Sequence, residues 1–237
     1  MNIYHITYSP VSKTACLYFR GCNFACKGCV RRKESQDIHL KEAFAQPGTS
    51  VRFLTLMEVM RRLNKVEVQN AVFMGGEPTI DPKLPDLAKL IHKELGANNI
   101  LLTNGFILPP LEHVDEACLS LKALDNCLHL DFTGKSNHKT LENFVKYYRS
   151  IKLRSESILI PGYIDCEEIE KIARFIADVN PNIPYRIDGY IPVPGASWRR
   201  PTSEEVDKAV NVARRHLTNV SCLKGSEGLQ GEVVKIF

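Results

Sequence analysis

The stretch of sequence that decides the fold runs over residues 68–105 and reads VQNAVFMGGEPTIDPKLPDLAKLIHKELGANNILLTNG. Its two ends, at 68–74 and 98–105, are short runs rich in strand-forming residues. Between them, DLAKLIHKEL has helical spacing, and this helix is preceded by Asp81-Pro82 and closed by Gly96. A strand, a helix and a second strand in this order predict two parallel strands joined by a right-handed crossover.

The same alternation of strand and helix patterns continues on both sides of this unit. Strands are expected at 14–19 (TACLYF), 127–132 (CLHLDF), 155–161 (SESILIP) and 184–191 (PYRIDGYI), and helices at 55–63, 141–149, 167–179 and 204–217. This rhythm indicates an α/β fold with parallel strands, either a doubly wound sheet or a full or partial barrel. In both arrangements, ligands bind at the C-terminal ends of the strands.

The composition is that of an ordinary globular protein. The chain has 237 residues, of which 44% are hydrophobic and 24% charged, so we treat residues 1–237 as one domain. No apolar run approaches the roughly 20 residues that span a bilayer, and the N-terminus lacks the pattern of a secretory signal. We therefore expect a cytoplasmic protein without a membrane partner. The net charge of +4, with basic and acidic residues interleaved, does not indicate nucleic acid binding.

Three of the eight cysteines are crowded into eight positions directly after the strand expected at 14–19. Cys22, Cys26 and Cys29 follow a C-x3-C-x2-C spacing, which lets a short loop wrap three thiolates around a compact metal centre. Such soft ligands select zinc, copper or an iron–sulfur cluster. A structural zinc ion usually needs a fourth ligand, and the nearby histidines that offer one are His5 and His39. The other five cysteines are scattered, and we expect them to be buried as small hydrophobic residues.

This cysteine spacing resembles the hallmark of the radical S-adenosylmethionine (SAM) superfamily. The element at residues 75–78, Gly-Gly-Glu-Pro, resembles the loop with which that family binds the SAM amino group, and residues 103–105 resemble the Thr-Asn-Gly segment of glycyl-radical-enzyme activases. The resemblance implies a partial (βα)6-type barrel of parallel strands, with one four-iron, four-sulfur cluster and SAM at the strands' C-terminal end. The implied cluster ligands are Cys22, Cys26 and Cys29, and the implied SAM-binding residues are Gly75, Gly76, Glu77, Pro78, Thr103 and Asn104.

Residues 123–165 resemble the second half of pyruvate formate-lyase activating enzymes, mainly in TGKSNHKTLEN and IPGYID. In that family an Asp and a Lys lie close together at the end of the fifth strand. Asp131 matches the Asp and is a further implied SAM ligand, but Phe132-Thr133 follow it, and the lysine is absent unless Lys135 replaces it. Gly28 is a second departure, because many relatives carry an aromatic residue there that contacts adenine.

The resemblance implies an enzyme that reductively cleaves SAM to a 5′-deoxyadenosyl radical, which abstracts hydrogen from a partner protein, a glycyl radical enzyme. It also implies an electron donor such as ferredoxin or flavodoxin. Two alternatives stay open: the radical modifies a small molecule, nucleobase or peptide, or the cysteines form a non-catalytic iron–sulfur or zinc binding module. The sequence nominates no catalytic residue. Asp188, Tyr163, Tyr190 and the loop at 198–200 are candidates for contact with SAM or substrate.

Overall fold

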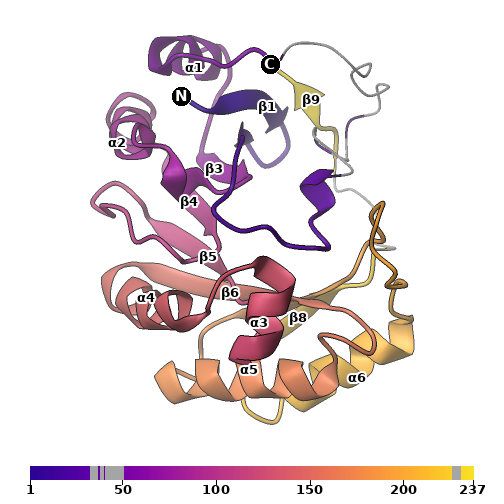
Figure 1. Ribbon diagram of the computed structural model, residues 1–237. Helices are drawn as coiled ribbons and strands as arrows, with labels where there is room; N and C mark the ends of the chain where they lie inside the picture. The colour runs from indigo at the N-terminus through magenta and orange to yellow at the C-terminus, as the bar shows by residue number, and fades with distance from the viewer. Residues whose placement is uncertain (33–36, 38–39, 41–50, 226–230) are drawn as a thin grey trace.

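The computed structural model describes residues 1–32, 37, 40, 51–225 and 231–237. These residues form one sheet with the spatial order β8-β7-β6-β5-β4-β3-β2-β1-β9 (Figure 1). The strands are β1 (Ile3–Ser9), β2 (Thr14–Phe19), β3 (Asn70–Gly75), β4 (Asn98–Thr103), β5 (Glu116–Ser120), β6 (Lys152–Leu159), β7 (Tyr185–Gly189), β8 (Val220–Leu223) and β9 (Val234–Lys235). The helices are α1 (Leu56–Leu63), α2 (Leu84–Leu95), α3 (Asn126–Thr133), α4 (His138–Ser150), α5 (Cys166–Val179) and α6 (Ser203–Ala213), with short 3-10 turns η1 (Val30–Arg32) and η2 (Pro78–Ile80).

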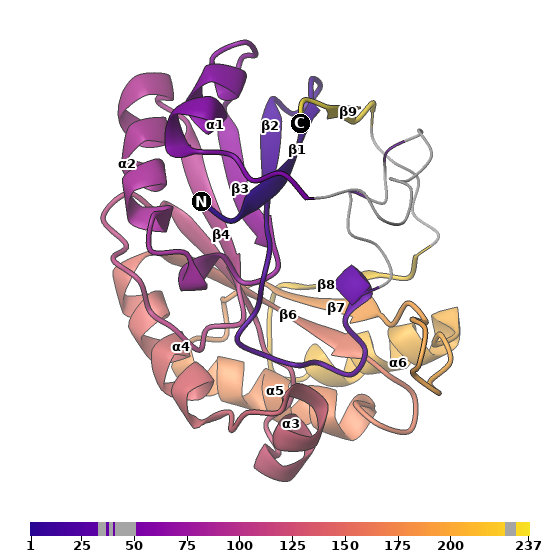
Figure 2. The same cartoon turned by 45° about the horizontal axis from the view of Figure 1, so that its top comes forward.

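The sheet is a partial barrel. Strands β2 to β8 run parallel to one another, and β1 and β9 extend the sheet beyond β2 as antiparallel strands. The sheet curves so that the helices lie mainly on its outer side, and β8 and β9 end it without closing the ring (Figures 1 and 2). The predicted α/β fold with a partial barrel is confirmed, with β8 as one parallel strand more than the six expected.

Alternate strand residues build the main core between the sheet and the helices. On β2, Leu17 and Phe19 are buried, and they belong to the same cluster as Leu63 of α1 and Leu87 and Ile91 of α2. Because neighbouring side chains on a strand point to opposite faces, the residues between them face the inside of the barrel. The concave face and the C-terminal strand ends are therefore left free for polar groups.

Local signals end and begin the helices as the sequence predicts. Gly96 adopts a left-handed conformation with φ of 62° and closes α2. The Thr202 hydroxyl accepts a hydrogen bond from the backbone N–H of Glu205, whose carboxylate accepts one from the Thr202 N–H, and this capping box starts α6. Within the described residues, none of the helices is both long and apolar enough to cross a bilayer.

One element differs from the sequence-based expectation. Residues 127–132 were expected to form a strand that ends near Asp131, but they lie in helix α3. The Asp125 carboxylate caps this helix by accepting a hydrogen bond from the Leu128 N–H at 2.9 Å, and Gly134 ends it with φ of 76°. These two caps outweigh the alternating apolar pattern of CLHLDF. The fifth strand is β5, which the sequence analysis did not recognise.

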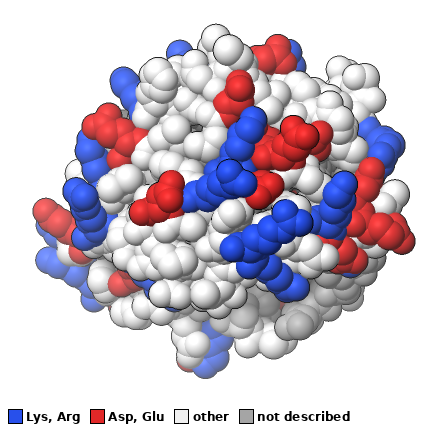
Figure 3. Space-filling model, turned by 90° about the horizontal axis from the view of Figure 1, so that it is seen from below, with Lys and Arg blue, Asp and Glu red and all other residues white. Residues whose placement is uncertain are grey.

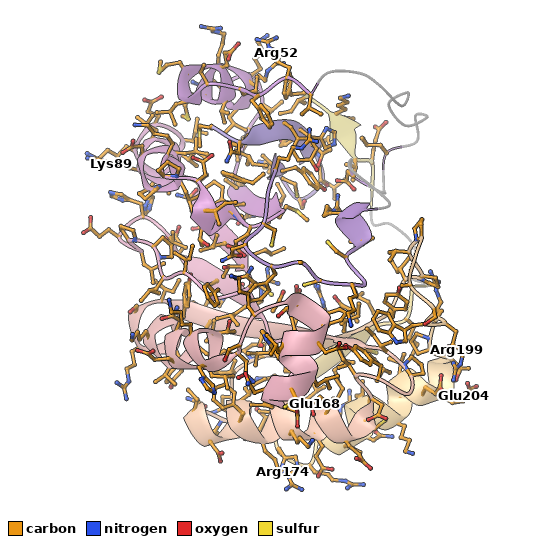
Figure 4. All side chains as sticks on the ribbon, viewed as in Figure 1. Arg52, Lys89, Glu168, Arg174, Arg199 and Glu204 are labelled. Carbon is orange, nitrogen blue, oxygen red and sulfur yellow. The ribbon has the colours of Figure 1, made fainter. Side chains whose placement is uncertain are left out.

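A buried carboxylate on α5 holds the segment that joins β5 to α3 (Figure 4). Glu168 is only 3% exposed, and its Oε1 atom accepts hydrogen bonds from the backbone N–H groups of Leu124, at 2.5 Å, and Asp125, at 2.8 Å. Its Oε2 atom pairs with Lys171 at 3.1 Å. The two backbone donors would be left buried without a charged acceptor if this carboxylate were removed.

We therefore predict that Glu168→Gln lowers the free energy of unfolding by about 1–3 kcal/mol, because hydrogen bonds from buried donors to a charged acceptor are lost or weakened. Urea unfolding followed by circular dichroism measures this change. The matched control is Glu167→Gln on the same helix turn, where the side chain is exposed and the change should stay within about 0.5 kcal/mol. Equal stabilities of the two variants would contradict the assigned role.

Candidate functional site

The C-terminal ends of the parallel strands surround a cavity of about 1230 Å³ on the concave side of the sheet. The cavity is lined by the three cysteines after β2, by residues 75–77 at the end of β3, and by Thr103 and Asn104 at the end of β4. Farther along the sheet, the charged or polar lining residues are Ser120, Lys122, Glu156, Arg186 and Asp188. Most of the residues that the sequence singled out thus meet in one place, whereas Pro78 and Asp131 do not line the cavity.

The cysteine loop leaves β2 and passes beside helix α3 (Figures 1 and 2). The backbone N–H of Ala25 donates to the Thr133 carbonyl at 2.8 Å, and that of Lys27 donates to the Phe132 carbonyl at 3.0 Å. Carbonyls in the last turn of a helix have no partner within it, so α3 offers them to the loop. The end of α3 therefore fixes the middle of the loop between Cys22 and Cys29.

The three thiols of this loop are free of disulfide bonds and face one cavity. Burial raises the pKa of the Cys26 thiol to about 11 and that of Cys22 above its ordinary value, while nearby Lys122 opposes both shifts. A metal centre with soft ligand preference would displace these protons. Among the described residues, no three His, Cys, Asp or Glu side chains are placed to hold a single metal ion. A cubane cluster has a different requirement: each thiolate binds a different iron, so the three sulfur atoms lie farther apart. His39 lies outside the described residues.

The other cysteines are less uniform than expected. Only Cys118 among these five is buried, Cys127 is exposed on α3, and Cys16, Cys166 and Cys222 are half-buried. The expectation that all five are buried is therefore confirmed only for Cys118, and it was wrong for Cys127.

Two glycines after β3 let its end touch the cysteine loop. Gly75 pairs with Phe19 across the parallel strands, and the Gly76 N–H donates to the Phe19 carbonyl at 2.7 Å. The Glu77 N–H donates to the Gly21 carbonyl at 2.8 Å. A Cβ atom on Gly76 would lie 2.0 Å from the Gly21 oxygen, and Gly75 has φ of 105°, so both positions require glycine.

The Glu77 carboxylate is buried next to this backbone contact and accepts hydrogen bonds from residues of η2 and of the end of β4. The side chain is 1% exposed, and the carboxylate accepts hydrogen bonds from the Thr79 hydroxyl (2.6 Å), the Thr103 hydroxyl (2.8 Å) and the Asn104 N–H (2.7 Å). Burial raises the pKa of this carboxyl, and the hydrogen bonds oppose the shift. Glu77 thereby joins the ends of β3 and β4. Pro78 begins the 3-10 turn η2 that follows and is itself buried.

Asn104 connects the end of β4 to the cysteine loop. Its amide Nδ2 donates to the Asn23 side-chain oxygen at 2.7 Å and lies 3.7 Å from the Cys22 sulfur. Its own side-chain oxygen accepts a hydrogen bond from the Phe106 N–H at 3.0 Å. The position of Cys22 therefore depends on a segment about 80 residues away in the sequence.

Asp131 lies on the outer side of the same loop. It is exposed on α3, where its carboxylate pairs with the Lys27 ammonium at 2.5 Å and accepts a hydrogen bond from the Tyr163 hydroxyl at 2.5 Å. These contacts hold the pKa of the Asp131 carboxyl below its ordinary value. The expectation that Asp131 ends the fifth strand was wrong, because that strand is β5.

The lysine that the sequence analysis found missing follows the true fifth strand. Lys122 comes two residues after Ser120, the last residue of β5, and lines the cavity. No described residue forms a hydrogen bond or ion pair with its ammonium, which lies close enough to influence both Cys22 and Cys26. The short, mostly apolar run at 117–121, bounded by Glu116 and Lys122, was the signal that could have identified this buried strand and the lysine after it. Lys135 lies outside the cavity lining and does not replace it.

Charged side chains of β6 and β7 form a connected group on the cavity wall. Arg186 binds Glu156 at 2.7 Å and Asp188 through two contacts at 2.7 and 2.9 Å, and Ser120 donates to Glu156 at 2.6 Å. Burial raises the pKa of the Asp188 carboxyl, and Arg186 opposes this. Burial also acts on Glu156, but Arg186 and Lys122 outweigh it and leave its pKa below the ordinary value.

Aromatic side chains from three other segments close around Gly28. A Cβ atom there would lie 3.0 Å from the Tyr190 ring, 3.4 Å from Phe132 and 3.5 Å from Trp198. Trp198 stacks on Tyr163 with ring centroids 4.5 Å apart. Phe132 lines the cavity, but Tyr163, Tyr190 and Trp198 do not. These three therefore pack behind the cysteine loop, and glycine at position 28 makes room for them.

Comparison with known proteins agrees with this geometry. The sequence model of the Radical SAM superfamily matches residues 17–176. A putative glycyl-radical enzyme activating enzyme of Methanocaldococcus jannaschii is 32% identical over 230 residues, which cover 92% of this chain and 83% of the relative. The pyruvate formate-lyase 1-activating enzyme of Escherichia coli K12 is 28% identical over 176 residues, which cover 68% of each chain.

Solved structures share the architecture. The crystal structure of a radical SAM methyltransferase from Sphaerobacter thermophilus matches with a TM-score of 0.64 at 17% identity, over 88% of this chain and 65% of the other. At this identity the likeness concerns the fold alone. The family match covers more than half of the chain and includes the cysteine loop and the ends of β2 to β6, but not that of β7. The chain therefore belongs to the radical SAM superfamily and is a radical SAM enzyme, whose cofactors are a four-iron, four-sulfur cluster and SAM.

Proposed function

We propose that Cys22, Cys26 and Cys29 hold the cluster and that the surrounding strand ends hold SAM. The donor set supports this, because three free thiols face one cavity and soft sulfur ligands suit iron–sulfur clusters. When bound, the reduced cluster and SAM supply a one-electron cleavage of the sulfonium and thereby a 5′-deoxyadenosyl radical. The chain's own residues bind and orient these groups and limit the access of water.

The polar groups of SAM have distinct partners in this proposal. The backbone at Gly75 and Gly76 binds its amino group, since the absence of side chains leaves carbonyls accessible there. Glu77 acts beneath them by holding the loop, together with Thr103 and Asn104. Lys122 binds the SAM carboxylate, because this ammonium lines the cavity near the cysteines and no described residue pairs with it.

We infer that the hydrogen atom is taken from a glycyl radical enzyme, so that this chain is an activase. The observation that carries this proposal is the 32% identity over 92% of the chain to a putative activating enzyme of that class. The cavity supports it as well: at about 1230 Å³ it exceeds the roughly 300–1,000 Å³ of typical small-ligand pockets, which leaves room for a peptide loop beside SAM. The electron would come from a carrier such as ferredoxin or flavodoxin.

The activase proposal predicts a glycyl radical on a partner. The anaerobically reconstituted and reduced chain is incubated with SAM and a glycyl radical enzyme from the same source organism. We expect the electron paramagnetic resonance doublet of a glycyl radical, with one 5′-deoxyadenosine formed for each radical. Formation of 5′-deoxyadenosine that is stimulated only by small molecules, without a glycyl radical on any such enzyme, would favour the small-molecule alternative.

The assignment of Lys122 predicts a change in SAM affinity. We expect Lys122→Ala to weaken SAM binding about 10–100-fold, because a charge-assisted hydrogen bond to the carboxylate is lost. Equilibrium dialysis with labelled SAM measures this on the cluster-loaded chain. Lys135→Ala, which changes an exposed lysine outside the cavity, should bind SAM as the unaltered chain does. Equal affinities of both variants would refute the assignment.

The contact between Gly76 and Gly21 predicts that Gly76→Ala disrupts the cofactor site. Its new methyl group would displace the Gly21 carbonyl, which immediately precedes Cys22, so SAM-dependent 5′-deoxyadenosine formation should fall at least about 100-fold. Gly96→Ala is the control: it strains a left-handed glycine, but its Cβ meets nothing within 4 Å. This control should retain activity although it loses about 1 kcal/mol of stability. A Gly76→Ala variant with normal turnover would contradict the proposed loop geometry.

A further inference from the structure

The cysteine loop has an outer side that reaches the protein surface. Ala25 and Lys27 are exposed, whereas Gly28 is buried. The loop is bordered by α3 and by the segment after β4: the Phe24 ring lies 5.7 Å from Phe106 and 5.5 Å from His129 of α3. The cluster ligands thus lie between the cavity on one side and this surface on the other.

Three lysines gather on this outer surface. Lys27 belongs to the loop itself. Lys135 follows Gly134, where a Cβ atom would lie 3.7 Å from that of Ala25. The ammonium of Lys139 lies 5.2 Å from the centre of the Phe106 ring. All three side chains are exposed. The exposed carboxylate of Asp131 lies on the same surface and pairs with Lys27 at 2.5 Å, so Lys135 and Lys139 give this surface its excess of positive charge.

The helices α5 and α6 present a different charge distribution. On α5, Arg174 pairs with Glu170 at 2.9 Å and Lys171 pairs with Glu168 at 3.1 Å. Seen from this side, basic and acidic side chains lie next to one another across the surface (Figure 3). Beside the cysteine loop, by contrast, only Lys27 has such a partner, in Asp131, and no described residue forms an ion pair with the ammonium of Lys135 or Lys139.

Exposed apolar side chains accompany these lysines. Leu130 on α3 has 50% of its surface exposed, and Ile107 and Leu108, which directly follow Phe106, are each 37% exposed. An apolar centre with a charged rim is the usual composition of a protein-binding surface. We call the surface formed by Lys27, Leu130, Lys135, Lys139 and Phe106 the α3 face.

We propose that the α3 face is the docking site of the protein that delivers the electron, a small one-electron carrier with an acidic surface. This inference goes beyond the proposed activase function, because SAM cleavage needs an electron whatever the substrate is. SAM and substrate would occupy the cavity, so the carrier approaches the cysteines from the outer side of the loop, where Ala25 and Lys27 between them are exposed. One electron leaves the carrier for each C5′–S bond of SAM that breaks, and no proton or chemical group crosses this surface.

Charge complementarity determines the occupant. Lysines around an apolar centre attract an acidic partner and speed its association, an effect that weakens as salt screens the charges. A transient complex suits this task, because the carrier must leave after each electron. A glycyl radical enzyme or a second copy of the chain is the alternative occupant, and neither requires the rate of electron delivery to depend on these lysines.

The test uses Lys135→Glu/Lys139→Glu in the full-length chain, loaded with cluster. The matched control is Lys89→Glu/Lys93→Glu, which reverses two exposed lysines that are likewise four residues apart, on α2 (Figure 4). Two readouts are taken at low salt: the affinity for oxidised flavodoxin and ferredoxin, by isothermal titration calorimetry, and the rate of 5′-deoxyadenosine formation. The rate is measured with each reduced carrier and separately with dithionite, which needs no docking site.

We expect the α3-face variant to bind the carrier about tenfold more weakly and to turn over about tenfold more slowly with it, while its dithionite-driven rate stays unchanged. The α2 control should behave as the unaltered chain in all measurements. An α3-face variant that matches this control with both carriers would overturn the proposal, as would a loss of the dithionite-driven rate. Failure of the unaltered chain to accept electrons from either carrier would also overturn it. No glycyl radical enzyme is present, so the result is independent of the activase proposal.

Discussion

The backbone contact between the end of β3 and the start of the cysteine loop is the constraint on which the site depends. The Gly76 N–H reaches the Phe19 carbonyl and the Glu77 N–H reaches the Gly21 carbonyl, so the pairing of β2 with β3 continues beyond both strands. This is possible only where the Gly76 position carries no Cβ atom. Cys22, the first of the three proposed cluster ligands, and the glycines at 75 and 76 are thereby placed side by side.

A buried carboxylate extends this arrangement to the next strand. Removing the charge of Glu77 from water is unfavourable, but hydrogen bonds from Thr79, Thr103 and the Asn104 backbone offset the loss. Asn104, held in this way, places its side-chain amide next to the sulfur of Cys22. The residues of the glycine loop and of the Thr-Asn-Gly segment thus act largely on one another. In the proposed SAM site, they would act on SAM through the backbone that they hold in position.

The sequence allowed the fold class and the centre of the site to be predicted because their signals are local. Each signal is contained in one short segment: the cysteine spacing in residues 22–29, the two glycines at 75 and 76, and the helix in residues 84–95. The prediction was wrong around α3 because CLHLDF alternates like a strand, whereas the caps at Asp125 and Gly134 make this segment a helix. That error displaced the end of the fifth strand, and Lys122 was overlooked as a result. The contacts of α3 with the cysteine loop join residues more than 100 positions apart, and no local pattern encodes them.

The packing around Gly28 shows that the C-terminal part of the chain belongs to the same unit as the cysteine loop. Tyr190 and Trp198 lie on the segment after β7, yet their rings occupy the space that a side chain at position 28 would need. A large residue between the last two cysteines is therefore incompatible with this C-terminal segment, and the two features must change together. Glycine at position 28 is thus explained by aromatic residues about 160 positions away in the sequence, because their rings leave no room for a larger side chain there.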